Sequence, residues 1–111
     1  MPEFQYSLNA STIKPTPLLE KIRIAGAVGF SGIELWHDDI DTFLNQGGAL
    51  VDIKKALSDQ GLSVPTTIYL GDWFDTTGQA YEKALDECKR RMHQSAELGA
   101  PHVIAGPPGG P

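Results

Sequence analysis

The sequence predicts an α/β protein whose short strands lie side by side in one parallel sheet. Three glycines, Gly29, Gly61 and Gly99, each separate a helical pattern from a short apolar run. Glycine suits the residue that follows a helix, because it adopts the left-handed conformation without a steric penalty. Strands that alternate with helices in this way are joined by right-handed crossovers, so the predicted order is β-α-β-α-β-α-β.

Four apolar runs are the expected strands: Phe4–Leu8, Gly32–Trp36, Val64–Leu70 and His102–Ala105. The chain then reaches the tail AGPPGGP, where the next helix of the pattern should begin. We therefore expect residues 1–111 to form a single partial domain that is truncated after its fourth strand.

Three amphipathic helices are expected between the strands. The first begins at Thr16, which can cap it, and Pro17, which suits a first turn. The second runs from about Ala49 to Gln60 and the third from about Gly78 to Leu98. Spacing at the helical period predicts that the following residues face the core: Leu18, Ile22, Ala25 and Val28; Leu50, Ile53, Lys54 and Leu57; Tyr81, Leu85, Cys88, Met92 and Ser95.

The composition restricts the partners and the compartment. The 111 residues have a formal net charge of −5, and the Lys and Arg residues are scattered along the chain. A nucleic-acid or anionic membrane partner needs a clustered basic surface, so we expect neither. Cys88 is the only cysteine, and the N-terminus lacks the pattern of a secretory signal, which together predict a cytoplasmic protein.

Glu34 is a carboxylate inside an otherwise apolar strand, in the run GFSGIELWHDD. A buried charge is costly unless it is paired or hydrogen-bonded, so this residue needs a structural partner or a function. A structural Glu34 would accept hydrogen bonds from a neighbour such as Asn9 or a tyrosine. A functional Glu34 would be catalytic, because ligands of parallel α/β sheets bind beyond the carboxyl ends of the strands.

Further polar and aromatic residues follow the same strand ends. Asn9 follows the first strand, Trp36 and His37 end the second, and Tyr69 and Trp73 end the third. The two tryptophans either stack on the apolar face of a sugar or pack under a loop. Tyr69 either donates a hydrogen bond to a substrate or fills space as a β-favouring aromatic residue.

The run His37-Asp38-Asp39 permits two interpretations. A histidine beside carboxylates can bind a divalent metal or transfer a proton, although adjacent side chains on an extended segment point in different directions. We expect the two aspartates to lie in a solvated loop where Asp39 or Asp41 caps a short helix. His37 is then either a substrate contact or part of that loop.

The run GFSGIELWHDD, placed after an amphipathic helix, resembles the xylose isomerase-like (β/α)8 barrels, a group that includes sugar phosphate isomerases and epimerases. The runs SLNAST, VPTTIYLGDW and GAPHVIAGPPG occur in matching order. The resemblance covers essentially the whole chain but only the first half of such a barrel. It implies that the α/β fold is half of a TIM (β/α)8 barrel.

The resemblance also implies a function. Such enzymes of carbohydrate metabolism move a proton next to a carbonyl, as isomerases, epimerases or dehydratases of the 3-dehydroshikimate type. A divalent metal, Mn²⁺, Mg²⁺ or Zn²⁺, is implied for the full barrel, with Glu, Asp and His ligands on later strands that are absent here. Onto this sequence the resemblance carries Glu34 as catalytic and Asn9, Trp36, His37 and Tyr69 as substrate contacts, and it implies that this chain alone is inactive.

A sheet of four strands has two open edges and an exposed inner face, which something must cover. One hypothesis is the N-terminal half of an enzyme for a carbohydrate substrate, completed by the missing C-terminal half. A second is an assembly module that pairs with another copy of itself and closes the barrel without catalysis. A third, an open flavodoxin-like binding domain, ranks last because NASTIKPTP after the first strand lacks a glycine cluster for phosphate.

Overall fold

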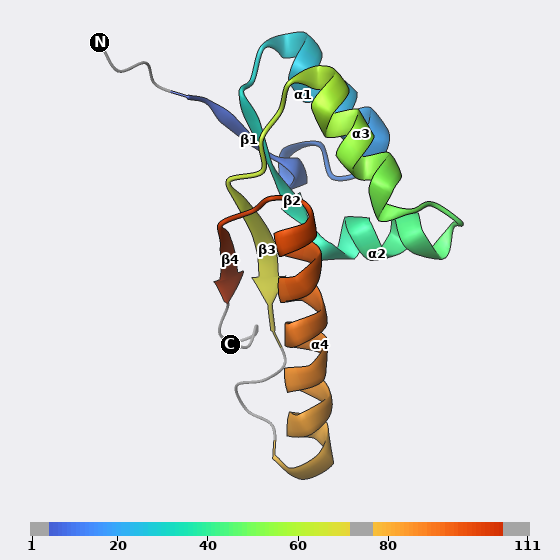
Figure 1. The fold of residues 1–111 in the computed structure, drawn as a ribbon, viewed down its shortest axis with the longest axis vertical. Helices are drawn as coiled ribbons and strands as arrows, with labels where there is room; N and C mark the ends of the chain where they lie inside the picture. The colour runs from blue at the N-terminus through green and yellow to red at the C-terminus, as the bar shows by residue number, and fades with distance from the viewer. Residues whose placement is uncertain (1–4, 72–76, 106–111) are drawn as a thin grey trace.

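The computed structural model describes residues 5–71 and 77–105 of the chain. Its strands are parallel and form one sheet in the order β1-β2-β3-β4 (Figure 1). The predicted alternation of strands and helices in a parallel sheet is confirmed. The elements are β1 (Ser7–Asn9), the 3-10 helix η1 (Ala10–Ile13), α1 (Leu18–Val28), β2 (Gly32–Trp36), α2 (His37–Asn45), α3 (Leu50–Gln60), β3 (Thr66–Leu70), α4 (Gly78–Glu97) and β4 (His102–Ala105).

The side chains of β2, which lies between β1 and β3, alternate between the two faces of the sheet. Ile33 and Leu35 are fully buried in the apolar core under the helices. Glu34 and Trp36 point to the opposite face, because successive side chains of a strand alternate, and both are half-buried. Asn9 of β1 is the register partner of Glu34, so its side chain lies on that same face.

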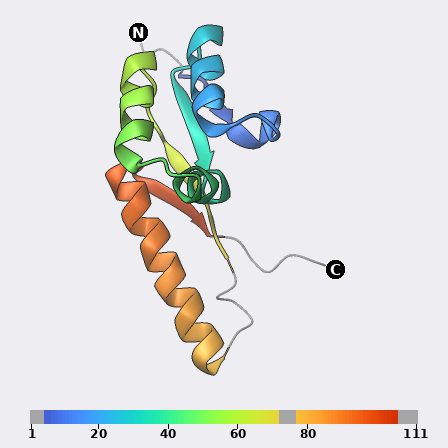
Figure 2. The same cartoon turned by 90° about the vertical axis from the view of Figure 1, so that its right-hand side faces the viewer.

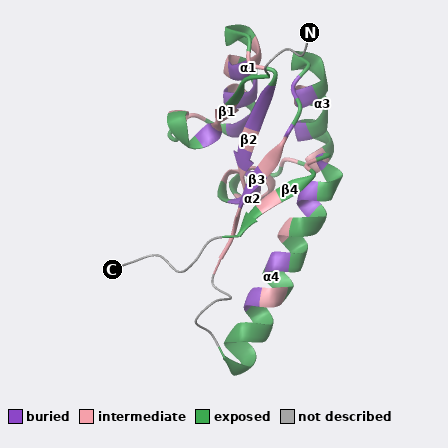
Figure 3. Cartoon of the chain, turned by 90° about the vertical axis from the view of Figure 1, so that its left-hand side faces the viewer, coloured by how far each residue is buried: buried purple, intermediate pink, exposed green. Residues whose placement is uncertain are grey.

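The apolar core lies between β2 and the pair of helices α1 and α3, which contact each other and lie side by side in Figure 1. Ile22 of α1 and Ile53 of α3 are fully buried, as the helical spacing predicts. Burying an aliphatic side chain of this size contributes roughly 1.5–3 kcal/mol. Figure 3 shows the buried residues concentrated in β2 and on the facing sides of these helices.

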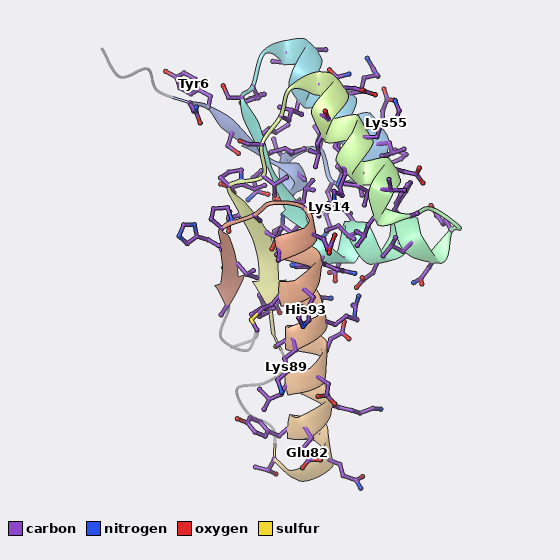
Figure 4. All side chains as sticks on the ribbon, in the orientation of Figure 1. Tyr6, Lys14, Lys55, Glu82, Lys89 and His93 are labelled. Atoms are coloured by element: carbon purple, nitrogen blue, oxygen red, sulfur yellow. The ribbon has the colours of Figure 1, made fainter. Side chains whose placement is uncertain are left out.

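Helix α4 differs from α1 and α3 because its contact with the sheet is short and partly polar. Its C-terminal half packs beside β3 and β4, whereas its N-terminal half projects beyond the sheet (Figures 1 and 2). Ser95 and Cys88 of the predicted stripe are buried, but Tyr81 and Met92 are 40% and 45% exposed. The expectation of one continuous buried face is therefore wrong for this helix. Its outer surface carries exposed polar side chains, including Glu82, Lys89 and His93 (Figure 4).

Three other expectations about helix faces and caps are wrong. Pro17, not Thr16, is the N-cap of α1, and no side chain caps that end. Val28 is 69% exposed because it is the last residue of α1, beyond the part of the helix that the sheet covers. Gly29 then ends the helix at a φ of 103°, a left-handed conformation that favours glycine. Lys54 is exposed on α3.

Helix α2 begins earlier than the expected short helix. It begins at His37, directly after β2, so Asp38 and Asp39 lie in its first turn and not in a loop before it. Neither Asp39 nor Asp41 occupies the N-cap, which is Trp36. Carboxylates in a first turn are stabilised by the positive end of the helix dipole, which is the physical reason for this placement.

The strand boundaries differ at two N-termini. β1 covers Ser7–Asn9 and β3 begins at Thr66, later than the expected starts at Phe4 and Val64. Further expectations rested on Phe4, on Trp73 and on residues 106–111 of the tail AGPPGGP, and all of these lie outside the described residues. Within the described part of the chain, no helix has the length and apolar character needed to cross a membrane.

Candidate functional site

The carboxamide of Asn9 connects three elements at the carboxyl ends of β1 and β2. Its Oδ1 accepts a hydrogen bond from the indole Nε1 of Trp36 at 2.8 Å and another from the backbone N of Ser11 at 3.0 Å. These two donors fix the orientation of the carboxamide, since only the oxygen can accept. The Nδ2 group therefore points at Glu34 and donates to its Oε2 at 3.4 Å.

Glu34 thus has the structural partner that its position in an apolar strand requires. The contact with Asn9 uses only Oε2, and within the described residues no hydrogen bond to Oε1 is present. Glu34 also forms no ion pair there, so its charge is not neutralised by a neighbouring cation. One oxygen of a half-buried carboxylate is consequently free to accept a hydrogen bond from a ligand.

Trp36 and Tyr69 form the aromatic part of this group. Their ring centroids are 6.4 Å apart and the rings are inclined by 51°, within the range of favourable aromatic pairs. Both side chains are half-buried. The structure therefore brings together four of the five expected site residues, Asn9, Glu34, Trp36 and Tyr69, at one end of the sheet.

His37, the fifth expected site residue, lies elsewhere. The side chain follows Trp36 in sequence and so points to the other face, where it is fully buried between α2, β3 and α4. Its Nε2 is 2.9 Å from Oγ1 of Thr67, and its Nδ1 is 3.2 Å from Oε1 of Gln94. A ring enclosed in this way has no surface for a substrate, so we correct its expected role from substrate contact to buried polar residue.

Two ion pairs hold the first turn of α2 at the end of β2. The ammonium of Lys21 in α1 is fully buried and lies 2.6 Å from Oδ2 of Asp39. Arg91 in α4 donates to Oδ1 of Asp38 at 3.1 Å and to the backbone oxygen of Tyr69 at 2.8 Å. The first turn of α2 is therefore anchored on both sides, which fixes the position of the preceding Trp36.

The electrostatics beside α2 are set by α4. Arg90 donates two hydrogen bonds to the carboxylate of Asp41, at 3.1 and 2.9 Å. These bonds and the charge of Arg90 lower the pKa of Asp41 although its desolvation acts in the opposite direction. Burial lowers the pKa of His37, and a hydrogen bond from its ring to Gln94 opposes that shift.

A small cavity of about 80 Å³ opens beside Trp36, between η1, α1 and α2. Such a volume accommodates a small chemical group or a few water molecules, and not a whole sugar. Its walls are Ser11, Lys14, Lys21, Trp36, Asp38 and Asp39.

The donor atoms of the described residues are not arranged to bind a divalent metal. Among residues 5–71 and 77–105, no group of three or more His, Cys, Asp or Glu side chains is arranged to coordinate an ion. Glu34 is accompanied by the NH₂ group of Asn9, which is a donor and cannot be a ligand. The described residues therefore do not form a divalent-metal site.

Comparisons with solved structures identify the fold. The chain is similar to a xylose isomerase-like TIM barrel/4-hydroxyphenylpyruvate dioxygenase fusion protein, with a TM-score of 0.77 and 21% identity over 96% of this chain and 17% of that one. It is similar to a probable 3-DHS dehydratase, AsbF, involved in petrobactin synthesis, from Bacillus anthracis, with a TM-score of 0.72 and 19% identity over 92% of this chain and 38% of that one. It is also similar to an AP endonuclease, family 2, from Brucella melitensis, with a TM-score of 0.66 and 21% identity over 95% of this chain and 40% of that one.

The fold is accordingly that of half a TIM barrel, as the resemblance implied. The chain spans between 17% and 40% of the length of the solved structures that it matches. No family model matches the chain, and no curated protein matches it in a sequence search.

Sequence reasoning missed the residues that support the site from outside. Thr67, Ser95 and Gln94 bind His37, and Lys21 and Arg91 anchor α2. Lys21 falls between Leu18 and Ile22, on the face that packs on the sheet, and a lysine on an apolar face was a usable signal. Thr67 inside the third strand offered a similar signal, whereas nothing in the sequence indicated Arg91.

The bridging role of Asn9 generates a first prediction. Asn9→Ala removes the acceptor for the Trp36 indole, so the indole N–H resonance in a ¹H–¹⁵N spectrum should shift and exchange faster with water. The loss of a partly buried hydrogen bond should cost about 1 kcal/mol of unfolding free energy. Ser11→Ala is the matched control, because Asn9 binds the backbone of Ser11 and not its hydroxyl. An indole resonance that is the same in Asn9→Ala and the unmodified chain would contradict the bridge.

The lowered pKa of His37 generates a second prediction. The unfolded chain takes up a proton near pH 6.5, and the folded chain does so only at lower pH, so the unfolding free energy should fall as the pH drops below about 6.5. The slope should approach, at most, about 1.4 kcal/mol per pH unit. Urea unfolding between pH 7.5 and 5.5 measures it. His37→Gln should be flatter over the same interval, and an equal slope in both chains would rule out the assignment.

Proposed function

We propose that this chain supplies the substrate-contacting half of a sugar or sugar phosphate isomerase or epimerase that moves a proton next to a carbonyl. The proposal rests on one observation: Asn9, Glu34, Trp36 and Tyr69 meet at the carboxyl ends of parallel strands. Ligands of α/β barrels bind at that end of the barrel. A carboxylate beside two aromatic rings is a suitable arrangement for a ligand that has both hydroxyl groups and an apolar face.

In this proposal Glu34 is the group that accepts or returns the substrate proton. Its Oε1 forms no hydrogen bond with the described residues, so it can approach a carbon-bound or hydroxyl proton of the substrate. Asn9 keeps the carboxylate oriented through Oε2 while the reaction proceeds at the other oxygen. A positioned carboxylate of this kind typically contributes a factor of roughly 100 to 10,000 to the rate.

Trp36 and Tyr69 are the proposed binding surface for the sugar ring or chain. The indole N–H is already used by Asn9, so Trp36 offers mainly its apolar face to a ligand. The two rings are inclined by 51°, and a carbohydrate in the angle between them would contact both. The Tyr69 hydroxyl would then donate a hydrogen bond to a substrate oxygen.

The metal that the resemblance implies does not fit the described residues, and we assign no step of the reaction to it here. If the complete enzyme uses Mn²⁺, Mg²⁺ or Zn²⁺, its ligands have to come from another part of the barrel. The chain alone would then lack activity. The residues on this chain would still bind and orient the substrate and transfer its proton.

The partner we propose is the remainder of the barrel, four further strands with their helices. Three observations support it: the chain spans at most 40% of the similar structures, both outer strands have an open edge within the described residues, and Ile104 of β4 is 45% exposed. An open, partly apolar sheet edge promotes association until another strand covers it.

A barrel closed by a second copy of the chain is the alternative partner. A two-fold axis along the strands would pair β4 of one copy with β1 of the other, and all eight strands would remain parallel. Light scattering separates the alternatives, because a stable particle of twice 12.0 kDa would favour the copy.

The similar structures also suggest two other reaction classes. A dehydratase of the 3-DHS type likewise removes a proton next to a carbonyl, so the role proposed for Glu34 would be the same and the substrate would differ. An endonuclease acts on a polyanion, and the net charge of −5 with scattered Lys and Arg does not favour DNA as a partner. We therefore keep the dehydratase as the second candidate.

The decisive variant is Glu34→Gln in a chain that carries all eight strands. The carboxamide has the same shape but cannot take up a proton, so kcat should fall roughly 100- to 10,000-fold while the unfolding free energy stays within about 1 kcal/mol. The assay is turnover of a panel of ketoses and ketose phosphates in the presence of Mn²⁺. Adding 3-dehydroshikimate to the same panel of substrates tests the second candidate, because a dehydratase would convert it.

Glu82→Gln is the matched control for this experiment, since Glu82 is exposed on α4 and distant from the strand ends (Figure 4). Its kcat should equal that of the unmodified protein. Unchanged turnover in Glu34→Gln, on a substrate that the unmodified protein converts, would remove Glu34 from the catalytic residues.

A further inference from the structure

A buried polar cluster lies directly behind the candidate site, on the opposite face of the sheet. His37 is at its centre, and its Nε2 lies 2.9 Å from Oγ1 of Thr67 and 3.3 Å from Oγ of Ser95. The two hydroxyl oxygens are 2.5 Å apart. Oε1 of Gln94 accepts a hydrogen bond from Nδ1 of the ring at 3.2 Å. All four side chains are at most 7% exposed, so they bind one another in place of water.

This cluster joins α4 to the ends of β2 and β3. His37 follows Trp36 at the end of β2, and Thr67 precedes Ile68 and Tyr69 in β3. Arg91, one turn before Ser95 on the same helix, donates to the backbone oxygen of Tyr69 at 2.8 Å. Helix α4 therefore contacts the backbone of Tyr69 directly and contacts His37, the residue that follows Trp36.

The hydrogen bonds of the neutral imidazole run in one direction. Gln94 directs its NH₂ group toward Oδ1 of Asp41, at 3.5 Å, which leaves its oxygen to accept from Nδ1–H of His37. Nε2 then has no proton and accepts from the Thr67 hydroxyl. Thr67 in turn accepts from Ser95. The order of donation is Ser95 to Thr67 to His37 to Gln94.

Protonation of His37 reverses the hydroxyl part of this chain without leaving a donor unpaired. Nε2–H would donate to Thr67, whose hydroxyl would turn and donate to Ser95. Ser95 has a further acceptor ready, the backbone oxygen of Arg91 at 3.0 Å. The cluster thus has two complete hydrogen-bonding arrangements, one for each charge state of the ring.

The charged groups around the ring decide when the second arrangement forms. Arg90 and Arg91 of α4 oppose a positive imidazole, and burial opposes it further. Asp41 of α2 favours it, and is itself shared with Arg90 through two hydrogen bonds. The group of β3 that faces the imidazole is the uncharged hydroxyl of Thr67. A positive ring would repel Arg91, the residue that also holds the Tyr69 carbonyl. Within the described residues, these two arginines also form ion pairs with other carboxylates: Arg91 with Asp38, and Arg90 with Glu87.

We propose that His37, Thr67, Ser95 and Arg91 act as positioning residues that set the Trp36–Tyr69 geometry from behind the sheet, and that the charge state of His37 shifts this geometry. The link runs from the ring through Thr67 to β3 and through Arg91 to Tyr69. This inference goes beyond the proposed reaction, since it concerns only the shape of the strand ends. It can be tested on the chain without any substrate.

The experiment follows two NMR signals of the chain between pH 7.5 and pH 5: the imidazole proton of His37 and the ¹⁵N-labelled indole of Trp36. Trp36→Phe assigns the indole signal, and His37→Gln assigns the imidazole signal. We expect the Trp36 resonance to move in a single step with the same midpoint as the titration of His37. In Thr67→Val the protonated ring loses its acceptor and the neutral ring loses its donor. The hydrogen bond of the charged ring is the stronger of the two, so that midpoint should fall by about one pH unit.

Two further variants separate positioning from mere packing. Thr67→Ser restores the hydroxyl in a smaller side chain, so it should return the midpoint to within a few tenths of a pH unit of the original. Thr66→Val makes the same chemical change one residue earlier, on the other face, and should leave the midpoint unchanged. If Thr67→Val does not fold, Ser95→Ala removes the next hydroxyl of the chain and should also lower the midpoint.

A Trp36 resonance that stays constant while His37 titrates would overturn the proposal. Equal midpoints in Thr67→Val and Thr66→Val would do the same. Neither result depends on turnover, so it would leave the proposed role of Glu34 intact. Conversely, unchanged turnover in Glu34→Gln would not affect the proposed coupling between His37 and Trp36.

Discussion

Every feature of the site depends on the alternation of side chains along β2. Ile33 and Leu35 are fully buried against the helices, and this fixes the face to which Glu34 and Trp36 point. A slip of one residue would bring a carboxylate into the apolar core and move two aliphatic side chains out of it. The buried aliphatic pair therefore specifies the register strongly, and the register brings Glu34 opposite Asn9.

The structure uses different kinds of interaction on its two sides. Around α1 and α3, the core is apolar, and its energy comes from burying aliphatic side chains. Around α4, the contact with the sheet depends on a histidine, two hydroxyls, an amide and an arginine. Hydrogen bonds need defined distances and directions, so this second side constrains the strand ends more specifically than apolar contact does. Its dependence on one imidazole also makes it the part of the fold that responds to mild acid.

The sequence predicted the sheet because its signals are local. Gly29, Gly61 and Gly99 mark the ends of helices, all three have a positive φ, and the apolar runs after them are strands. Asn9, Glu34, Trp36 and Tyr69 could be grouped because parallel strands end at the same edge. His37 could not be placed, since the chain turns into α2 at that residue without a loop or a capping side chain to announce it. The roles of Thr67, Ser95 and Arg91 depend on where α4 lies across β3, and this is a long-range property. The divalent metal stays a prediction, because its expected ligands lie on strands beyond the four described here and the described residues form no such group.

The most direct test of this account is a set of nuclear Overhauser effects measured across β2. The account predicts contacts from the Ile33 and Leu35 methyl groups to methyl groups of the α1–α3 core, together with a contact from the Trp36 indole N–H to the Asn9 side chain. A Glu34 side chain with contacts to Ile22 and Ile53 in place of Asn9 would show the opposite register. The strand would then present its carboxylate to the core, and the candidate site would not exist.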